Sequence, residues 1–479
     1  MAISQTAVFR RIVRDHMAPP PVQVRDDTRA SELVLRLRER RASAAAVVDG
    51  RGGLVGIVTE QDLMRRLDEP GQPVATLMTS PVLTVRDDDQ LYRAIGFMRR
   101  RQVRHMPVVN GSGAVVGVLE LHEALAVAAG PLVEEIDALT HEDSLDGLAE
   151  VKAAQIRLAG QLLTDGAPAP EIQALLADIN NDIHRRVLDL LLAELGPAPV
   201  SFACIVMGSG GRGESLLSPD QDNGFVLADY PDERHGAIDP WFVALAERFV
   251  SALDGLGFAL CRGGVMATSP VWRKSLSQWQ AQLAHWMLGR VPETLLNCEI
   301  FFDFRHVWGE QGLTEALRRH ATVTAAADHG FRMLMFGLQA QNRAGIGLFG
   351  RLQVERADST HRGEIDLKLH GTLPLVEAVR LLALSRGIAE TGTLARIDSL
   401  QADGTMSVDD ADHLRSAFAL LTGLQLRRQL ADHRSNAATG TFVDPKGLTE
   451  RELDLLRAAL RAINDFRASL RADLTGSLL

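Results

Sequence analysis

The sequence contains few cysteines and no long apolar run. Its three cysteines, Cys204, Cys261 and Cys298, are scattered without metal-ligand spacing. So sparse and odd a set excludes a disulfide framework and favours a reducing compartment. No run of 18 apolar residues is present, and the first residues lack the apolar core of a signal peptide. We therefore expect a cytoplasmic protein without a membrane partner.

A basic excess is also absent. The 51 Lys and Arg residues are outnumbered by 61 Asp and Glu, which gives a formal net charge of −10. This balance argues against a nucleic-acid partner, because nucleic-acid-binding domains are usually strongly basic. With 46% hydrophobic and 23% charged residues, the chain has the composition of a globular protein. Its 479 residues are enough for roughly two to four domains.

The first 130 residues repeat themselves at a fixed offset. MAPPPVQVRDD at Met17 matches MTSPVLTVRDD at Met78, VVDG matches VVNG, and GIV matches GVL, each pair 61 residues apart. Each copy predicts an extended segment, an amphipathic helix (30–40 and 91–100) and two apolar strands joined by a glycine turn. One copy cannot cover both faces of its small sheet, so we expect the two copies to pack together.

This repeat, over about residues 15–127, resembles a pair of CBS domains, with units at about 15–70 and 76–127. The family motif G-h-x-[ST]-x-x-D implies that Thr59 approaches the phosphate and Asp62 the ribose of AMP, ADP or ATP. In the second repeat Glu120 and Glu123 replace these residues, so we expect at most one nucleotide site. The alternative is that Thr59 only caps a helix and that the pair serves packing or dimerisation. The resemblance also implies a homodimer formed through the repeats.

Residues 131–198 predict a helical connector. Apolar periodicity indicates helices at 132–139, 145–163 and 172–195, with a break at the sequence DGAP. We interpret these helices as structural, and His184 as a packed or surface residue.

The most informative stretch is SFACIVMGSGGRGESLLSPDQDNGFVLAD, residues 201–229. It predicts a strand at 202–207, a glycine-rich turn, a short helical piece at 214–217 and a strand at 225–227. A P-loop is excluded, because Glu214 stands where that motif needs lysine. A Rossmann fingerprint fits the glycine spacing, but Pro219 leaves no room for a crossover helix between parallel strands.

A polymerase-beta-type nucleotidyltransferase is the third interpretation. Such enzymes carry h-G-[GS] after one strand and D-x-D before the next, and here Gly208-Ser209 and Asp220-Gln221-Asp222 match. Residues i and i+2 of an extended segment face one side, so the two carboxylates could hold Mg²⁺ or Mn²⁺ beside an NTP. Backbone N–H groups of the glycine-rich turn would approach the triphosphate closely. The expected phosphate contacts there are Gly208, Ser209, Gly210, Gly211 and Arg212.

The segment resembles the DUF294 nucleotidyltransferase family, a relative of the enzyme that uridylylates the PII signalling protein. Members often carry CBS repeats first, as here. Active members of the superfamily usually place a third carboxylate on a later strand. The expected strand, FALCRGGV at 258–265, has no acid. Asp303 is the best substitute for a catalytic role and Glu299 the second, although Asp303 could instead form a structural ion pair with Arg305.

The resemblance continues to the C-terminus, which predicts a helical substrate-binding region with helices at 375–385 and 411–430. Lys368 is the cation that we expect to contact nucleotide, because it stands in an apolar stretch where an unpaired lysine is costly. Asp366 and Glu364 are its alternative partners. Other cations that could contact substrate or acceptor are Arg273, Lys274, Arg351 and Arg386.

Together these patterns predict a mixed α+β chain with a CBS pair (1–130), a helical connector (131–198), a nucleotidyltransferase domain (199–325) and a helical domain (326–479). One hypothesis is an enzyme that transfers a nucleoside monophosphate from an NTP to an acceptor, which could be a protein, under control of the CBS pair. The other is a non-catalytic nucleotide sensor with the same fold. The preferred base and the acceptor do not follow from the sequence.

Overall fold

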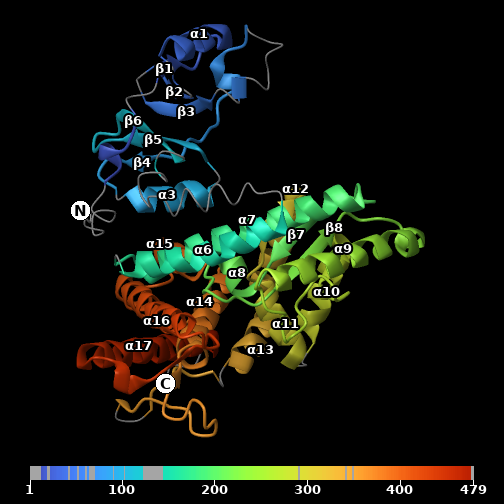
Figure 1. Cartoon of the computed structure of the whole chain (residues 1–479), viewed down its shortest axis with the longest axis vertical. Helices are drawn as coiled ribbons and strands as arrows, with labels where there is room; N and C mark the ends of the chain where they lie inside the picture. Colours follow the sequence, from blue (N-terminus) through green and yellow to red (C-terminus); the bar gives the residue numbers. More distant parts are fainter. Residues whose placement is uncertain are drawn as a thin grey trace. The chain divides into compact units, whose positions relative to one another are not determined.

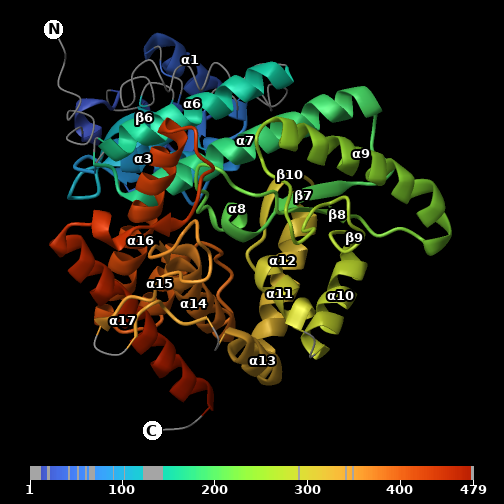
Figure 2. The ribbon, with the colours of Figure 1, turned by 60° about the horizontal axis from the view of Figure 1, so that its bottom comes forward.

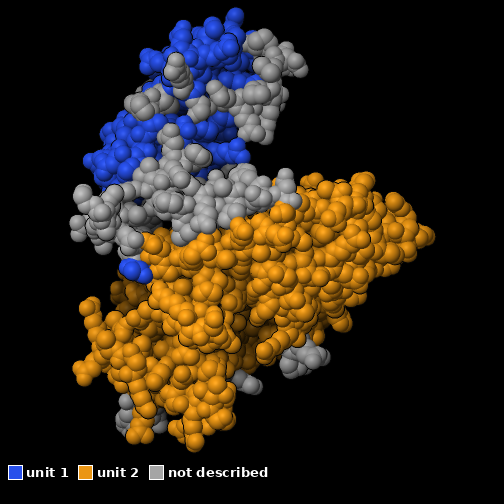
Figure 3. All heavy atoms as spheres, viewed as in Figure 1, with its two compact units in different colours: residues 1–138, 164–167 blue, residues 139–163, 168–479 orange. Residues whose placement is uncertain are grey.

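The computed structural model of the chain forms two compact units (Figure 3). One comprises residues 1–138 and 164–167, and the other residues 139–163 and 168–479. The structure describes residues 12–18, 22–40, 42, 44–50, 53–59, 62–63, 71–89, 91–101, 103–121, 124, 144–164, 166–289, 292–339, 342–347 and 350–475.

The first unit contains the same small structure twice (Figure 1). The first copy has β1 (Val22–Arg25), α1 (Ala30–Arg40), β2 (Ala44–Val48) and β3 (Leu54–Thr59). The second has β4 (Val85–Arg86), α3 (Leu91–Arg100), β5 (His105–Val109) and β6 (Val115–Glu120). In each sheet the first pair is parallel and the second antiparallel. Strands β2 and β3 recur as β5 and β6 at the 61-residue offset, which confirms the internal repeat.

The two copies exchange their entering segments. Thr79, at the start of the second copy, pairs with Ile57 of β3, and Ala18, at the start of the first, pairs with Val118 of β6. A Cβ added to Gly56 would lie 2.4 Å from the sulfur of Met78. At the equivalent Gly117 it would lie 2.5 Å from the sulfur of Met17. Each repeat therefore packs on the sheet of the other, as expected.

The second unit is built on a four-stranded sheet of order β10-β7-β8-β9. Strand β7 (Phe202–Val206) pairs antiparallel with β8 (Asn223–Leu227) and with β10 (Arg305–Gly309), whereas β9 (Arg273–Ser275) pairs parallel with β8. All residues of β7 and β8 are buried, so both faces of the sheet are covered. The packing helices are α7 (Ala169–Leu195), α9 (His235–Gly255), α10 (Leu276–Leu288) and α12 (Gln311–Ala327).

Two elements differ from the sequence prediction. Residues 258–265 are not a strand, because Gly263 and Gly264 turn the chain, and the N–H of Gly264 donates to the carbonyl of Cys261. Beside β8 the sheet instead continues with β9. The short helix of the glycine-rich turn is α8 (Gly208–Arg212) rather than residues 214–217, and it ends at Gly213, which has a positive φ of 73°.

The remaining helices surround this sheet and form the C-terminal bundle (Figure 2). They include α6 (Leu145–Thr164), α11 (Pro292–Phe301), α13 (His329–Gln339), the π-helical turn η6 (Lys368–Thr372), α14 (Leu373–Ser385), α15 (Thr393–Ala402), α16 (Val408–Arg434) and α17 (Glu450–Thr475). A two-stranded ribbon joins β11 (Ile365–Asp366) to β12 (Phe442–Val443).

The helix predictions for residues 145–163, 172–195, 375–385 and 411–430 are confirmed as α6, α7, α14 and α16. The helix predicted at 132–139 lies outside the described residues. Helix α14 is the centre of the bundle, because its residues from Pro374 to Leu384 are all buried. Among the described helices, none combines the length and apolar character needed to cross a membrane.

Candidate functional site

The glycine-rich turn and the acidic turn meet at the end of the central strands. After β7, the N–H of Met207 donates to the carbonyl oxygen of Asp222 (2.8 Å). Gly208 follows with a φ of 58°, and a Cβ there would lie 2.5 Å from Asp222 Oδ2. Only glycine allows this approach, because a side chain would collide with the carboxylate. The structure thus brings together Gly208 and Asp222, as the sequence predicts.

The D-x-D segment alternates between solvent and interior. Asp220 is exposed and Asp222 half-buried, whereas Gln221 between them is buried. The Gln221 side chain donates to the carbonyls of Val250 (3.0 Å) and Phe258 (2.9 Å). Through these two hydrogen bonds, Gln221 anchors the acidic turn to the buried segments at Val250 and Phe258. This role of Gln221 does not follow from the D-x-D pattern by itself, although the middle position between two acidic residues is the signal that marks it.

The electrostatics of Asp222 reflect its crowded surroundings. Burial raises its pKa above the ordinary value, the neighbouring Asp220 raises it further, and Lys368 and a hydrogen bond with Cys261 act in the opposite direction. Lys368, on η6 of the helical region, is exposed, so the expected burial in an apolar stretch is wrong. Asp366 is occupied instead by the N–H groups of residues 368 and 369. Lys368 is nevertheless close enough to act electrostatically on Asp222.

The oxygen ligands of this turn fit a hard divalent cation whose coordination is completed by the substrate. Asp220 and Asp222 supply two carboxylates, and Mg²⁺ often binds through one or two carboxylates together with phosphate oxygens and water. Among the described residues, no three His, Cys, Asp or Glu side chains are grouped to hold a metal by themselves. A metal at this turn would therefore need the phosphates.

Asp303 lies at the centre of an arginine cluster. It is fully buried, and it accepts hydrogen bonds from Arg212 (2.8 Å), Arg380 (2.7 Å) and Arg396 (2.8 Å). Burial alone would raise its pKa, but the three guanidinium groups hold the pKa well below its usual range. This environment is that of a structural ion cluster. The partners of Asp303 are three arginines that are distant in sequence. Arg305, the partner considered from the sequence, is not one of them.

Arg212 and Glu299 take part in the same cluster. The guanidinium of Arg212 donates to Glu214 (2.6 Å) as well as to Asp303, so the contacts of this expected phosphate ligand are directed at carboxylates. Glu299 is buried, accepts from Gln339 (2.7 Å) and lies 3.6 Å from Arg380. Both residues stabilise the packing behind the glycine-rich turn.

A segment of the helical region holds the glycine-rich turn from outside. Thr391 Oγ1 donates to the carbonyl of Gly211 (2.9 Å), and the N–H of Thr393 donates to Glu214 (2.6 Å). These contacts span about 180 residues of sequence, so no local pattern could reveal them. They link the C-terminal region directly to the turn that carries Gly208.

The other expected cations are placed as follows. Arg273 is buried and bonds to Asp239 (3.0 Å), while Lys274 is half-buried and its pKa is lowered by burial and by Arg273. Arg386 lies 3.6 Å from Asp403, and Arg351 is exposed.

In the CBS pair, the hydroxyl of Thr59 donates to Asp62 (2.7 Å), and so does the N–H of Thr59 (2.9 Å). The two motif residues are thus adjacent and bonded to each other. Glu120, at the position equivalent to Thr59, lies 3.9 Å from His105, and Glu123 lies outside the described residues.

Family models match this chain from near its start to near its end. The CBS domain model matches residues 13–69 and 74–130, and the models described as "Putative nucleotidyltransferase DUF294" and "Putative nucleotidyltransferase substrate binding domain" match residues 153–293 and 330–474. The chain carries a CBS-domain pair followed by the two DUF294 family domains. The candidate turn, with Gly208, Asp220 and Asp222, lies inside the first DUF294 match.

The matches to curated relatives cover a much smaller part of this chain than the family models do. Inosine-5'-monophosphate dehydrogenase of Mycobacterium bovis is 26% identical over 177 residues, 36% of this chain and 32% of that protein. Homoserine O-acetyltransferase of Methanocorpusculum labreanum is 30% identical over 107 residues, 22% of each chain. The chain thus spans about a third, or less, of these proteins.

Similar solved structures include the CBS domain protein PAE2072 from Pyrobaculum aerophilum complexed with AMP. It is 28% identical with a TM-score of 0.24, and the match covers 26% of this chain and 97% of that one. CBSX2 in complex with AMP is also 28% identical, with a TM-score of 0.22, covering 24% and 95%.

Proposed function

We propose that this DUF294 protein is a metal-dependent nucleotidyltransferase that transfers a nucleoside monophosphate from an NTP to an acceptor. The observation that carries the proposal is the contact of Gly208 with the Asp222 carboxylate, where a Cβ would lie 2.5 Å from Oδ2. It brings the start of the glycine-rich turn into contact with the acidic pair. Phosphate and metal would thus meet at one point.

The residues of the turn have distinct tasks in this proposal. Asp220 and Asp222 hold Mg²⁺ or Mn²⁺, which when bound neutralises phosphate charge during in-line transfer. The backbone of Gly208, Ser209 and Gly210 receives the triphosphate. Gly211, the fourth glycine-turn contact expected from the sequence, is less suited to this task, because its N–H already donates to the carbonyl of Met207 (3.0 Å). Lys368 contributes a cation from the helical region that already acts on Asp222. Asp303 and Arg212 keep the turn in position from behind and do not touch the reacting atoms.

A specific observation favours a second candidate, the non-catalytic nucleotide sensor. The acidic pair leads into β8, and the strand beside β8 is β9. The residues of β9 are Arg273, Lys274 and Ser275, so this strand supplies no third carboxylate. A sensor would bind Mg–NTP at the same turn and pass its state to a partner without transfer.

One experiment separates the two functions. The protein is incubated with labelled ATP, UTP, GTP and CTP, Mg²⁺ or Mn²⁺ and cell lysate, and label on macromolecules or small acceptors is measured. Transfer that disappears with Asp222→Ala supports the enzyme. The kind of molecule that carries the label shows whether the acceptor is a protein, as the analogy with the PII enzyme suggests. Tight NTP binding without transfer for all four nucleotides supports the sensor.

The CBS pair would regulate either activity through an adenine nucleotide bound by the first repeat. Thr59 and Asp62 are adjacent (2.7 Å) at the end of β3, whereas the second repeat has Glu120, whose charge would repel a phosphate. We further propose that the pair forms the contact of a cytoplasmic homodimer, which sedimentation of the full chain would test against a fragment lacking residues 1–130.

A further inference from the structure

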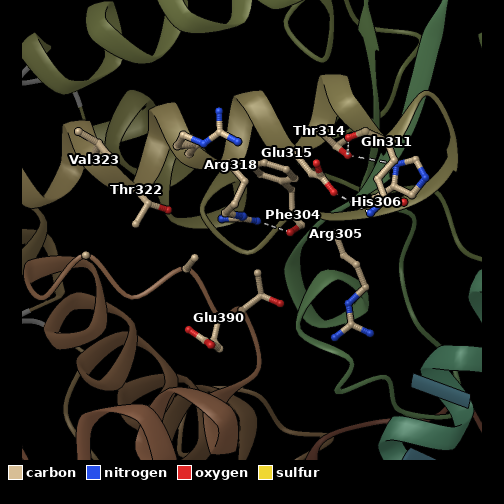
Figure 4. A pocket seen from close by; sticks show the side chains of 14 residues that line it. Phe304, Arg305, His306, Gln311, Thr314, Glu315, Arg318, Thr322, Val323 and Glu390 are labelled. Carbon is tan, nitrogen blue, oxygen red and sulfur yellow. Dashed lines mark hydrogen bonds between the residues drawn. The ribbon is translucent and has the colours of Figure 1, made fainter. Parts of the chain in front are cut away.

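A second cavity lies beside the glycine-rich turn and is separate from the acidic pair. It has a volume of about 590 Å³, within the range of about 300–1,000 Å³ that is typical of small-molecule sites. One wall comes from β10 and α12, and the other from the loop at residues 387–391 (Figure 4). Thr391 in that loop donates to the carbonyl of Gly211 (2.9 Å), which places the cavity against α8. Neither Asp220 nor Asp222 is part of its lining.

Arg318 of α12 presents a flat cationic face to this cavity. Its guanidinium stacks over the ring of Phe304 at 3.7 Å, and its two terminal nitrogens donate to the carbonyls of Phe302 (2.9 Å) and Phe304. Phe304 is only 2% exposed, whereas Arg318 is half-buried, so the accessible face of the stack is the guanidinium. Because both terminal nitrogens are already bonded, Arg318 is poorly placed to bind an anion in its plane. Its outer face is suited to a planar aromatic ring.

Thr322, one turn further along α12, brings a polar atom to the same wall (Figure 4). It is 6% exposed, and within the described part of the chain its hydroxyl has no hydrogen-bond partner. The nearby Thr324 instead donates to the carbonyl of His320 (2.8 Å), a common arrangement for a threonine in a helix. A buried hydroxyl without a partner is costly, so the hydroxyl of Thr322 favours a ligand that can bond to it.

Glu390 faces Arg318 and Thr322 from the opposite wall (Figure 4). It is exposed, and its carboxylate forms no ion pair or hydrogen bond with the residues that the structure describes. The other ionisable residues of the lining are Arg305, His306, Glu315 and Arg319. Arg305 already forms an ion pair, and Glu315 accepts from Gln311 (2.8 Å). Burial lowers the pKa of His306, so this residue is neutral at pH 7, and Arg319 is exposed. Glu390 is therefore the carboxylate that a ligand would meet.

We propose that this cavity binds a planar heteroaromatic ring with an amino-lactam edge, the edge that guanine and the pterins share. The ring would stack on Arg318, its adjacent ring N–H and amino group would donate to Glu390, and its carbonyl oxygen would accept from Thr322. Adenine and cytosine carry a ring-nitrogen lone pair beside the amino group, and uracil carries one N–H between two carbonyls. Each of these would turn a lone pair toward the carboxylate, which excludes it. This inference does not depend on the proposed transfer reaction.

Equilibrium dialysis of the full chain without divalent metal tests the proposal, with guanosine and pterin as probes. At least one should bind saturably with a dissociation constant below about 1 mM, and the tighter of the two identifies the source of the edge. Inosine lacks the amino group, 1-methylguanosine lacks the ring N–H, and lumazine replaces the amino group of pterin by a carbonyl. Each should bind roughly tenfold more weakly than its parent, since a charge-assisted hydrogen bond is lost.

Matched variants assign the binding to this cavity. Glu390→Gln should weaken the binding of the probe roughly tenfold, and Thr322→Val roughly threefold. Their controls should bind like wild type, because neither position lines the cavity. Glu247→Gln changes an exposed carboxylate on α9, and Thr324→Val removes a hydroxyl from the same helix as Thr322.

Two further variants separate this cavity from the other proposed nucleotide sites. Asp62→Ala in the CBS pair and the Asp220→Asn, Asp222→Asn double variant should both bind the probe like wild type. The proposal is overturned if neither guanosine nor pterin binds, or if the analogues bind as tightly as their parents. It is also overturned if Glu390→Gln binds like wild type, or if Asp62→Ala or the double variant loses the binding.

Discussion

The buried lysine below the acidic turn offers a quantitative test of how the helices support the site. Lys152 of α6 is 7% exposed, donates to Asn180 Oδ1 (2.9 Å) and lies 4.4 Å from the centre of the Phe258 ring. Phe258 in turn accepts a hydrogen bond from Gln221 (2.9 Å), the residue between the two acidic ligands. Burial lowers the pKa of Lys152 to about 7.

The sign and the size of the effect follow from proton linkage. An unfolded lysine has a pKa of about 10.4, so between pH 7 and that value the unfolded state binds one proton more than the folded state. The penalty for burying Lys152 is complete below pH 7 and disappears as the pH rises. Stability should therefore increase with pH by up to about 1.4 kcal/mol per unit, or about 2 kcal/mol from pH 7 to pH 9.

The Lys152→Met variant removes this dependence and keeps the volume of the side chain. Asn180 Oδ1 retains a donor in Gln155 (3.0 Å), so no acceptor is orphaned. Urea unfolding followed by tryptophan fluorescence at pH 7, 8 and 9 measures the effect, because all five tryptophans belong to the second unit. The difference between wild type and variant should change by about 2 kcal/mol in favour of wild type as the pH rises. Exposed Lys446→Met is the control, and parallel curves for wild type and Lys152→Met would refute the reasoning.

Three further predictions concern the ion cluster, the glycine turn and the CBS pair. Asp303→Asn should lower the free energy of unfolding by about 3–5 kcal/mol in urea titrations, because it leaves buried guanidinium groups uncompensated, whereas exposed Asp398→Asn should cost less than about 1 kcal/mol. Gly208→Ala should weaken Mg–NTP binding at least roughly tenfold, since its Cβ would displace the adjacent carboxylate. The control Gly404→Ala shares a positive φ (77°) but has open space, and equal loss of nucleotide binding in both would contradict the contact. Asp62→Ala should abolish the binding of one AMP per chain in calorimetry, and a stoichiometry of two would show that both repeats bind.

Much of the fold could be predicted from the sequence, because the patterns that indicate it are local. The 61-residue repeat and the helices at 30–40 and 91–100 depend on short-range periodicity, and the structure reproduces them at the same residues. The strand expected at 258–265 is not formed, because the Gly263-Gly264 turn interrupts the apolar run. Its place in the sheet is taken by Arg273–Ser275, a polar segment of three residues that no hydrophobic pattern marks.

The site was predictable only in its short-range part. Gly208 and Asp222 come together through one hairpin-like connection, so their spacing in the sequence was sufficient. From the sequence alone, Asp303 is an acid in an apolar run, which leaves a catalytic role and a structural ion pair both open. Its surroundings depend on Arg380 and Arg396, which are 77 and 93 residues away, and such long-range pairing cannot be derived from local pattern.

The central claim is that Asp220 and Asp222 form a metal site completed by nucleotide phosphates. Its most direct test is a calorimetric titration of Mg–NTP into wild type and into the Asp220→Asn, Asp222→Asn double variant, with the thermal melting of both proteins as a check on folding. Because Asp220 is exposed and Asp222 half-buried beside a turn, the double variant should fold and lose Mg²⁺-dependent nucleotide binding. Unchanged Mg–NTP affinity in a folded double variant would contradict the assignment of the site.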